Sequence, residues 1–334
     1  MIQNSKYLGR TTAAPQSQRG QRGFSLIELM IALAIGLLIM ATVITIYVAS
    51  SRTSRTAEME SQMNEDGLIA LNIIQQQIRM AGYSNFENPA TTDKSNFKGA
   101  GIIGCSTAAM YPNASTQKLL TALTDADCTA ASTLGDGVII RYEADRYNTV
   151  QNTAGAATVP TNCLIQAAIT VPAAGTTPQY RLAENRYYVA SSTTNPIPAV
   201  YCAGGTGAMP DYTIQMQPIL DNVEKMELRY GISATNEPED TQIVTYLTAS
   251  DINAAFASET VDDRWRRVVS VKICLRMRSA EPLTDIAATA TYRDCDGTQV
   301  TQTTPDGYLH RAFITTASVR NRLTITDRNR KNES

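Results

Sequence analysis

The chain has 334 residues, with 29 Lys and Arg against 31 Asp and Glu, and a formal net charge of −2. This length allows one large domain or two ordinary ones, and the near balance of charge gives no general indication of nucleic-acid binding. The charge is uneven, because residues 1–23 hold Lys6, Arg10, Arg19 and Arg22 and no acid, a local +4 that leaves −6 for the remainder. Such a basic segment is typical of a cleaved targeting leader.

An uncharged apolar segment of 23 residues follows, from Leu29 to Ser51. A helix of about 20 apolar residues spans the ~30 Å hydrocarbon core of a bilayer, whereas a secretory signal has an apolar region of only about 7–15 residues. The segment therefore predicts a single-pass transmembrane helix over about residues 24–51. The basic leader outweighs Arg52 and Arg55, so we expect the N-terminus in the cytoplasm and the rest of the chain outside.

The helical pattern continues beyond the membrane segment. No proline occurs from Phe24 to Ala81, and apolar residues recur after Ser51 at spacings of three and four, one stripe of an amphipathic helix. With Gly82 as its terminator, the pattern predicts one helix over residues 24–82 whose second half docks onto a domain. Two helices with a break near Ser50 are the alternative. The stripe comprises Met59, Met63, Gly67, Ala70, Ile74, Ile78 and Ala81, widened by Leu68, Leu71 and Ile73.

Glu28 lies four residues after Phe24, where the chain is about to enter the membrane. A charged side chain at mid-bilayer costs roughly 2.5–3.5 kcal/mol, although near the edge a carboxylate could reach the interface at lower cost. Cleavage between Gly23 and Phe24 would create an α-ammonium group about one helical turn from Glu28. Between parallel helices offset along their axes, the ammonium of one chain could then pair with Glu28 of its neighbour.

The stretch "RGFSLIELMIALAIGLLI" resembles the class III signal of type IV pilins and the related pseudopilins. That family has a basic leader ending in Gly, then Phe, Thr or Ser, a Glu at the fifth mature position, and a long apolar helix. The resemblance implies that a prepilin peptidase cleaves after Gly23 and N-methylates Phe24, and that Glu28 acts in assembly. The 23-residue leader is longer than in many major pilins, and the helix lacks the proline that many of them have.

Six cysteines are present, all after the apolar segment: Cys105, Cys128, Cys163, Cys202, Cys274 and Cys295. None forms a C-x-x-C pair and His310 is the single histidine, so metal-site spacing is absent and no cofactor is expected. An even number beyond the membrane favours disulfides made in an oxidising compartment. Pairing of sequence neighbours (105–128, 163–202 and 274–295) would stabilise the fold by roughly 3 kcal/mol apiece, and buried free thiols are the alternative.

After the helix we expect an antiparallel β-sheet resting on its second half, an α+β, pilin-like fold. Residues 83–135 show little periodicity and predict a loop region pinned by Cys105 and Cys128. Residues 136–334 then form a β-rich domain that ends in a polar tail, which we expect to be disordered. The expected strands are residues 137–144, 163–171, 185–191, 223–232, 266–279 and 311–323.

The strand at 266–279 has the clearest alternation of core and polar positions. One face is expected in the core: Val269, Val271, Ile273, Leu275 and Met277. The other face is basic and carries a cysteine: Ser270, Lys272, Cys274, Arg276 and Arg278.

Three weaker motifs narrow the resemblance. The stretches "QQQIRMAGYSNF" (75–86), "VEKMELRYG" (223–231) and "ASVRNRL" (317–323) look like the PilW type of minor pilin and are partly shared with the J-type pseudopilin of type II secretion. Removing 23 of 334 residues leaves 311, of which 252 follow Gly82 (334 minus 82). A head this large fits a filament tip better than a repeating lattice, which favours a low-copy subunit that initiates or caps the pilus.

The resemblance also implies partners and a location. The protein would contact other minor pilins and the major pilin through its N-terminal helix, and would meet the prepilin peptidase and the inner-membrane assembly platform. Before assembly it would be a single-pass inner-membrane protein with a periplasmic C-terminal domain, and afterwards it would lie at the pilus tip or cell surface. It would support pilus biogenesis and twitching motility, with DNA uptake or adhesion as further hypotheses; a J-type pseudopilin is the alternative.

Other functions have weaker signals. No nucleophile motif accompanies His310 in "PDGYLHRAF", so an enzyme is not expected. The acidic stretch "DCDGTQVTQTTPDG" (294–307) lacks the residue order of an EF-hand, and a disulfide-tied turn is the simpler interpretation. The cluster "RWRR" (264–267), with Lys272, Arg276 and Arg278, could contact DNA, although acids adjoin it and a solvated strand face explains it equally well.

Overall fold

The computed structural model describes residues 23–85, 95–106, 108–109, 130–131, 134–154, 157–174, 177–191, 196–237, 239–283, 291–302 and 306–322. The chain divides into two compact units, Met1–Arg55 and Thr56–Ser334, and each is described by itself. The leader before Gly23, the tail after Arg322 and Cys128 lie outside the described residues.

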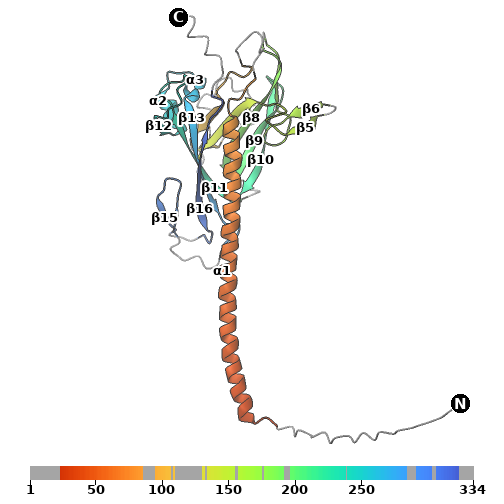
Figure 1. The fold of residues 1–334 in the computed structure, drawn as a ribbon, viewed down its shortest axis with the longest axis vertical. Helices are drawn as coiled ribbons and strands as arrows, with labels where there is room; N and C mark the ends of the chain where they lie inside the picture. Colours follow the sequence, from red (N-terminus) through yellow and green to blue (C-terminus); the bar gives the residue numbers. More distant parts are fainter. Residues whose placement is uncertain are drawn as a thin grey trace, which may run out of the picture. The chain divides into compact units, whose positions relative to one another are not determined.

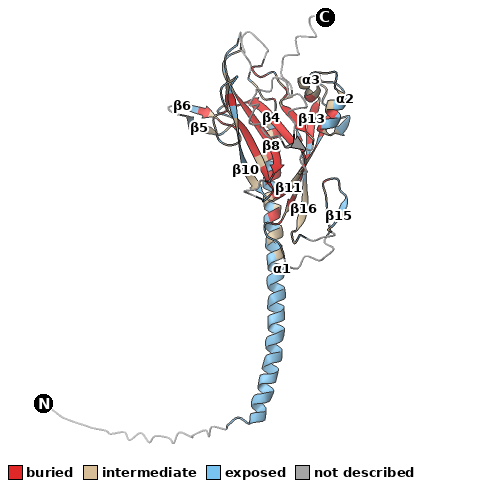
Figure 2. Ribbon diagram, turned by 180° about the vertical axis from the view of Figure 1, so that it is seen from behind, coloured by how far each residue is buried: buried red, intermediate tan, exposed pale blue. Residues whose placement is uncertain are grey.

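The first unit contains the apolar segment that the sequence predicts to span a membrane. Its described residues begin one long helix, α1 (Leu26–Met80), which includes Ser50 and Ser51 without a break (Figure 1), so the alternative of two helices is wrong. Every residue from 23 to 55 is exposed (Figure 2). The helix is long and apolar enough to cross a membrane, and its exposed apolar side chains need lipid or other apolar helices around them.

In the second unit, α1 presents an apolar stripe to the sheets. This confirms the predicted amphipathic pattern except at its margins, where Met59 is only half-buried and Leu68 is 65% exposed. Successive helical residues are rotated by about 100°, so Leu68 lies on a different side of the helix from Gly67. The buried residues of the helix are Met63, Gly67, Ala70, Leu71, Ile74 and Ile78.

The helix ends at Met80, and Gly82 follows with a left-handed φ of +78°. The Gly82 N–H donates to the carbonyl of Arg141 at 2.9 Å, and a Cβ at this position would lie 2.4 Å from the carbonyl oxygen of Asn321. Glycine is therefore required for the backbone conformation and for the close approach of the C-terminal segment. The predicted terminator is confirmed.

Two antiparallel sheets form the body of the second unit (Figure 1). The six-stranded sheet has the order β1 (Ile102–Cys105), β4 (Gly137–Glu143), β8 (Tyr180–Ala190), β9 (Ala199–Gly207) and β10 (Tyr212–Asp221), with β7 (Ile169–Val171) also paired to β8. The four-stranded sheet has the order β12 (Thr245–Leu247), β11 (Val223–Ile232), β13 (Val268–Arg278) and β16 (His310–Ser318).

Shorter elements complete the described fold. Two helices, α2 (Ala249–Ala255) and α3 (Val261–Arg266), separate β12 from β13 along the chain. Three two-stranded ribbons pair β2 (Ala108–Ala109) with β3 (Ala130–Ala131), β5 (Gln151–Ala154) with β6 (Ala157–Pro160), and β14 (Thr291–Arg293) with β15 (Gln299–Thr301).

One hydrophobic core joins the second half of α1 to both sheets (Figure 2). Ile74 of α1, Ile140 of β4 and Ile273 of β13 are each 0% exposed within it. A polar contact fixes the same packing, since Gln75 Nε2 donates to the carbonyl of Thr316 on β16 at 3.1 Å. The α+β fold class is therefore confirmed.

The expected strands are present with changes at their ends. Strand β11 has the predicted bounds, but residues 163–168 lie outside any strand, and β16 ends at Ser318. The predicted loop region 83–135 contains β1, which is fully buried in the six-stranded sheet. That prediction was wrong because a four-residue run is too short to show a period. On β13 the predicted core face is buried except at Val269, which is half-buried.

Candidate functional site

The predicted cleavage junction lies just before helix α1. Gly23, Phe24 and Ser25 adopt no regular structure, and Phe24 is 87% exposed. The helix begins at Leu26, and the carbonyl of Ser25 accepts a hydrogen bond from the N–H of Leu29 at 3.1 Å. The peptide bond between Gly23 and Phe24 is thus in exposed, non-helical backbone.

Glu28 caps the start of this helix. Its Oε2 accepts a hydrogen bond from the N–H of Ser25 at 3.1 Å, which is one half of a capping box. A carboxylate in the first turn also interacts favourably with the positive end of the helix dipole. At Gly23 an added Cβ would meet nothing within 4 Å, so the fold itself does not require glycine at the junction. Any requirement for glycine at position 23 would come from the binding site of an enzyme that cleaves the bond.

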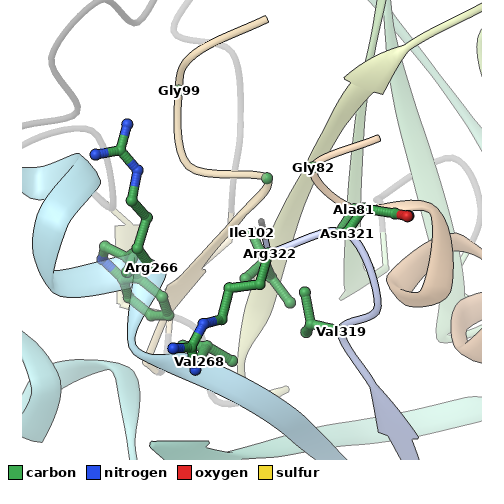
Figure 3. A pocket seen from close by; sticks show the side chains of 11 residues that line it. Ala81, Gly82, Gly99, Ile102, Arg266, Val268, Val319, Asn321 and Arg322 are labelled. Carbon is green, nitrogen blue, oxygen red and sulfur yellow. The ribbon is translucent and has the colours of Figure 1, made fainter. Parts of the chain in front are cut away.

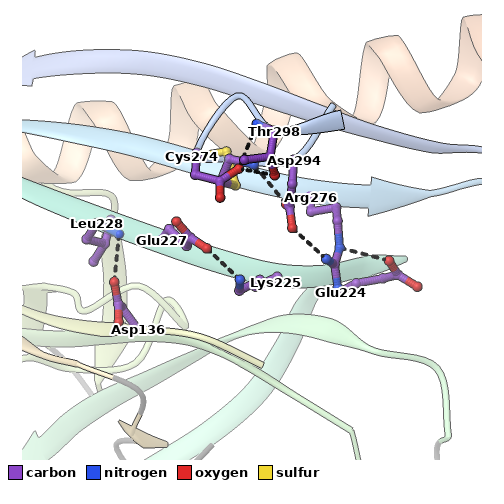
Figure 4. Close-up of a disulfide and its surroundings, with 11 residues drawn as sticks. Asp136, Glu224, Lys225, Glu227, Leu228, Cys274, Arg276, Asp294 and Thr298 are labelled. Atoms are coloured by element: carbon purple, nitrogen blue, oxygen red, sulfur yellow. Dashed lines mark hydrogen bonds and ion pairs between the residues drawn. A yellow bond between two sulfur atoms is a disulfide. The ribbon is translucent and has the colours of Figure 1, made fainter. Parts of the chain in front are cut away.

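Disulfides tie strands of the second unit to their neighbouring loops. Cys163 is bonded to Cys202 on β9 with a Cα–Cα distance of 6.5 Å, and Cys274 on β13 is bonded to Cys295 at 5.6 Å (Figure 4). These are the second and third of the neighbour pairs expected from the sequence. Cys105 is also disulfide-bonded, and its expected partner lies outside the described residues.

Two arginines of the predicted basic face of β13 have partners within the fold. Arg276 lies between Glu224 on β11 and Asp294 after β14, with Nε 3.2 Å from the first carboxylate and Nη1 3.0 Å from the second (Figure 4). The guanidinium of Arg278 lies over the ring of Tyr308, 4.3 Å from its centroid. These contacts engage Arg276 and Arg278, two of the cations that the DNA hypothesis would use, whereas Lys272 on the same strand is exposed.

The strand predicted over 266–279 begins only at Val268, and Arg266 of the "RWRR" cluster, expected to be its first residue, belongs to a helix. Residues 264–266 end helix α3, and Trp265 is 1% exposed and packs edge-on against Tyr230 with ring centroids 5.0 Å apart. Arg267 caps the helix and forms an ion pair with Glu259. The cluster therefore serves the core and the helix end, and its geometry gives no support to contact with DNA.

His310 bridges two carboxylates at the start of β16. Its Nδ1 lies 2.9 Å from Glu224 Oε2, its Nε2 lies 3.1 Å from Asp306 Oδ2, and Tyr292 stacks on its ring at 5.0 Å. Burial by itself lowers the pKa of His310, but the hydrogen bonds and charges of Glu224 and Asp306 raise it above its ordinary value. The three groups could in principle hold a metal ion, yet both ring nitrogens already face carboxylates and Arg276 adjoins Glu224.

The acidic loop after β14 is internally bonded. Asp294 pairs with Arg276, and Asp296 Oδ1 accepts hydrogen bonds from the N–H and hydroxyl of Thr298 at 2.8 and 2.7 Å. With Cys295 bonded to β13, this geometry supports the interpretation of a disulfide-tied turn.

A small cavity lies where the end of α1 meets the C-terminal segment (Figure 3). Its walls include Gly82, Trp265 and Arg322, and its volume is ≈ 20 Å³. That is room for about one water molecule and excludes a larger ligand.

A buried ionic cluster in the six-stranded sheet was missed by the sequence analysis. Glu184 Oε2 lies 3.1 Å from Arg141 Nε, and Glu184 Oε1 lies 2.7 Å from Arg186 Nη2. Burial alone would raise the pKa of Glu184, but the two guanidinium groups hold it below its ordinary value. The spacing of Glu184 and Arg186, two residues apart, is that of one face of a strand and can be read from the sequence. The pairing of Glu184 with Arg141 on β4 cannot.

Comparison with known proteins first defines the class of protein. Residues 18–44 match the model of the prokaryotic N-terminal methylation motif, which spans the Gly23–Phe24 junction and Glu28. The first unit therefore carries the signal of a type IV pilin-like protein. Residues 186–321, from β8 to the segment after β16, match the model described as Type IV pilus-assembly protein W. The two matches confirm the resemblance: residues 186–321 are similar to type IV pilus-assembly protein W, and residues 18–44 carry the N-terminal methylation motif.

Among solved structures, a type IV-like pilin from Thermus thermophilus is similar over 78% of this chain and 98% of its own, with 10% identity and a TM-score of 0.35. A TM-score at this level does not assign the fold, which rests on the elements described above. None of the curated proteins matches the chain significantly.

Proposed function

We propose that this chain is a minor type IV pilin, a low-copy structural subunit that primes assembly of the pilus or sits at its tip. The observation that carries the proposal is the position of Glu28. It is the single charge between an exposed Gly23–Phe24 bond and the end of the uncharged segment at Ser51. The PilW match supports this function over a J-type pseudopilin, which remains the second candidate, whereas the methylation motif is compatible with both.

The first step is processing of the leader. Hydrolysis of the Gly23–Phe24 peptide bond would add water, leave a carboxylate on the leader and free the α-amino group of Phe24 for methylation. The exposed, non-helical backbone at this bond suits a protease that binds its substrate in an extended form. The junction needs no local unfolding of α1, which begins two residues later at Leu26.

The second step is assembly in the membrane. In the single chain, Glu28 accepts one hydrogen bond from its own helix start, which leaves its charge without a cationic partner among the described residues. An ammonium group on Phe24 of a neighbouring subunit would supply one, and attraction between the two is strong where water is excluded. The exposed apolar surface from Leu26 onward would at the same time be covered by helices of other minor pilins and the major pilin.

The size of the second unit favours a low-copy position. It comprises Thr56–Ser334, with two sheets and several ribbons, so each copy would demand wide lateral spacing in a repeating filament. A tip subunit has no neighbour on one side. In this setting the protein would be held in the inner membrane before assembly, with its disulfide-bonded domain in the periplasm, and would support biogenesis and twitching motility. DNA uptake and adhesion have no site described here to carry them.

The test pairs Glu28→Gln with a matched control, Glu58→Gln. Glu58 is also an exposed acid of α1, but it lies beyond the uncharged segment. Both variants should be processed normally, with intact mass showing loss of residues 1–23 and one added methyl group. Only Glu28→Gln should be missing from sheared pili and should reduce piliation when it is the sole copy. Normal incorporation of Glu28→Gln would refute the pairing of charges, and a mature protein that begins at Met1 would refute the processing.

A strain that lacks this protein distinguishes a role in a type IV pilus from a role in a type II secretion system. Loss of surface pili and twitching, with export of folded enzymes intact, supports the minor pilin. Loss of export with pili intact would identify the pseudopilin instead. Subunit counting in sheared pili tests the low-copy position, since a stoichiometry near that of the major pilin contradicts it.

A further inference from the structure

A cavity of ≈ 300 Å³ lies on the six-stranded sheet of the second unit, between residues 96–99, strands β4, β7 and β8, and the start of α3. This volume is at the lower end of the range in which proteins bind small ligands or single side chains. Half of the residues that line it are apolar or aromatic: Phe97, Ile169, Val171, Tyr180, Leu182 and Met209. Phe97, Ile169 and Leu182 also form a small hydrophobic cluster separate from the main core.

Arg141, one of the residues that line the cavity, has an unpaired hydrogen-bond donor. Arg141 is 6% exposed, and its Nε donates to Glu184 Oε2 at 3.1 Å. Its Nη2, equally buried, has no hydrogen-bond partner in the part of the chain that the structure describes. Folded proteins rarely leave such a group unsatisfied, because burial removes the water that would otherwise accept from it.

An unpaired acceptor lies in the same cavity wall. Asn96 is 8% exposed, and its Nδ2 donates to both carboxylate oxygens of Glu143, at 3.0 and 3.2 Å. These bonds fix which end of the amide is nitrogen, so Oδ1 faces elsewhere. Within the described residues Asn96 Oδ1 has no donor. Two residues that line one cavity therefore carry a buried donor and a buried acceptor, each without a partner among the described residues.

The charges around the cavity sum to zero. The buried charged residues in its wall are Arg141 and Glu184. At the mouth, the exposed Lys98 is balanced by the half-exposed Asp262. A charged ligand would upset this balance in a region of low dielectric constant, so the cavity fits a neutral head group that both accepts and donates a hydrogen bond.

We infer that this cavity binds an apolar residue of a partner polypeptide, with a backbone carbonyl accepting from Arg141 and a backbone N–H donating to Asn96. A peptide unit is neutral and carries one acceptor and one donor, and an aliphatic or aromatic side chain would fill the apolar wall. Burial and the charge of Glu143 raise the pKa of Tyr180 to about 12, so its hydroxyl keeps its proton. A sugar fits less well, because several of its hydroxyls would lie against the apolar and aromatic half of the wall.

The test uses the full-length protein in detergent micelles with ¹³C-methyl-labelled methionine, because Met209 lines the cavity. The Met209 methyl signal is assigned with Met209→Leu and followed during titration with N-acetyl-leucine N′-methylamide. Ligands this small bind in the millimolar range even in good sites. We expect a saturable shift of Met209, at least about tenfold weaker binding of the glycine analogue, and no shift with N-acetylglucosamine.

Two variants and a control locate the binding. Val171→Trp fills the cavity and should abolish the shift, whereas Val150→Trp, at an exposed valine outside the cavity, should bind like the wild type. Arg141→Lys keeps the charge beside Glu184 but removes Nη2, and it should weaken binding about tenfold. Absence of a saturable shift in the wild type overturns the inference. Undiminished binding by Val171→Trp, or an equal response to N-acetylglucosamine, does so as well.

Discussion

Replacing Gly67 with alanine should destabilise the second unit, although alanine is the better helix former. Gly67 lies in the buried stripe of α1, opposite Phe313 of β16. A Cβ built on it would lie 2.7–2.8 Å from three ring atoms of Phe313, including Cγ. Because Cγ is at the root of the ring, a small rotation of the ring cannot relieve the contact.

The magnitude follows from two opposing effects. Alanine favours the helix interior by about 1 kcal/mol over glycine. Overpacking of a core costs about 1–3 kcal/mol. Gly67→Ala should therefore lower the free energy of unfolding by about 0–2 kcal/mol in the wild type. In a Phe313→Ala background the clash is gone, and the same change should raise the free energy of unfolding by about 1 kcal/mol, or about 2–4 °C in Tm.

The assay is a double-mutant cycle followed by tryptophan fluorescence during urea unfolding in detergent. The chain has one tryptophan, Trp265, which is buried in the core of the second unit and reports on its unfolding. A coupling of about 1–3 kcal/mol between Gly67 and Phe313 is expected. Equal stabilisation by Gly67→Ala in both backgrounds would mean that the two residues do not clash. Equal destabilisation would place the strain elsewhere.

Three further changes should alter stability in the second unit. His310 has a raised pKa, so the stability that it contributes should be present below its unfolded pKa of about 6.5 and be lost as pH rises through the folded value. Asp306 has a lowered pKa, so its contribution to stability should be lost as pH falls below about 4. Urea unfolding at a series of pH values from about 3 to about 8 measures the contributions of both residues. Glu184→Gln should cost about 3–5 kcal/mol in urea unfolding, because two buried guanidinium groups lose their carboxylate. Cys274→Ser should cost about 3 kcal/mol by opening the loop to Cys295, measured as a lower urea midpoint.

Each of these changes has its own control. His310→Gln should remove the loss of stability on the alkaline side, and an unchanged pH profile would contradict the role of the histidine. Glu227→Gln breaks a half-exposed pair with Lys225 and should cost less than about 1 kcal/mol; a similar loss for Glu184→Gln would contradict its burial argument. Cys274→Ser/Cys295→Ser should behave like the single variant, and a wild-type midpoint in either would contradict the disulfide.

The elements that the sequence predicts best are those whose apolar pattern extends over many residues. The uncharged run and the stripe on α1 extend over many turns, so the helix, its terminator at Gly82 and its buried face are all predictable. The stripe is less informative about its width, and Leu68 is exposed where a core position was expected. The reason for glycine at position 67 could not be predicted at all, since Phe313 lies 246 residues further along the chain (313 minus 67).

Two helices were missed although their signals are in the sequence. Thr248 caps α2 and forms a reciprocal capping box with Asp251, and Thr260 caps α3 with its hydroxyl accepting from the N–H of Asp263. A Thr followed three residues later by an acid is a recognised helix start, but seven and six residues are too few to show an apolar period. Strand β9 was missed for another reason: its glycines weaken the strand pattern, and Gly204 is needed because a Cβ would lie 2.6 Å from Asn162.

The candidate sites also differ in how far the sequence predicts them. The junction and Glu28 lie within one short stretch, so their spacing alone carries the hypothesis of processing and assembly. The cavity on the six-stranded sheet depends on strand register instead, because Arg141 on β4 lies opposite Glu184 on β8 only when the two strands pair as they do here. Glu184 is shared with Arg186, and this sharing leaves one nitrogen of Arg141 unpaired beside apolar walls. No local pattern contains that information, because it takes three residues on two strands to create one unsatisfied donor.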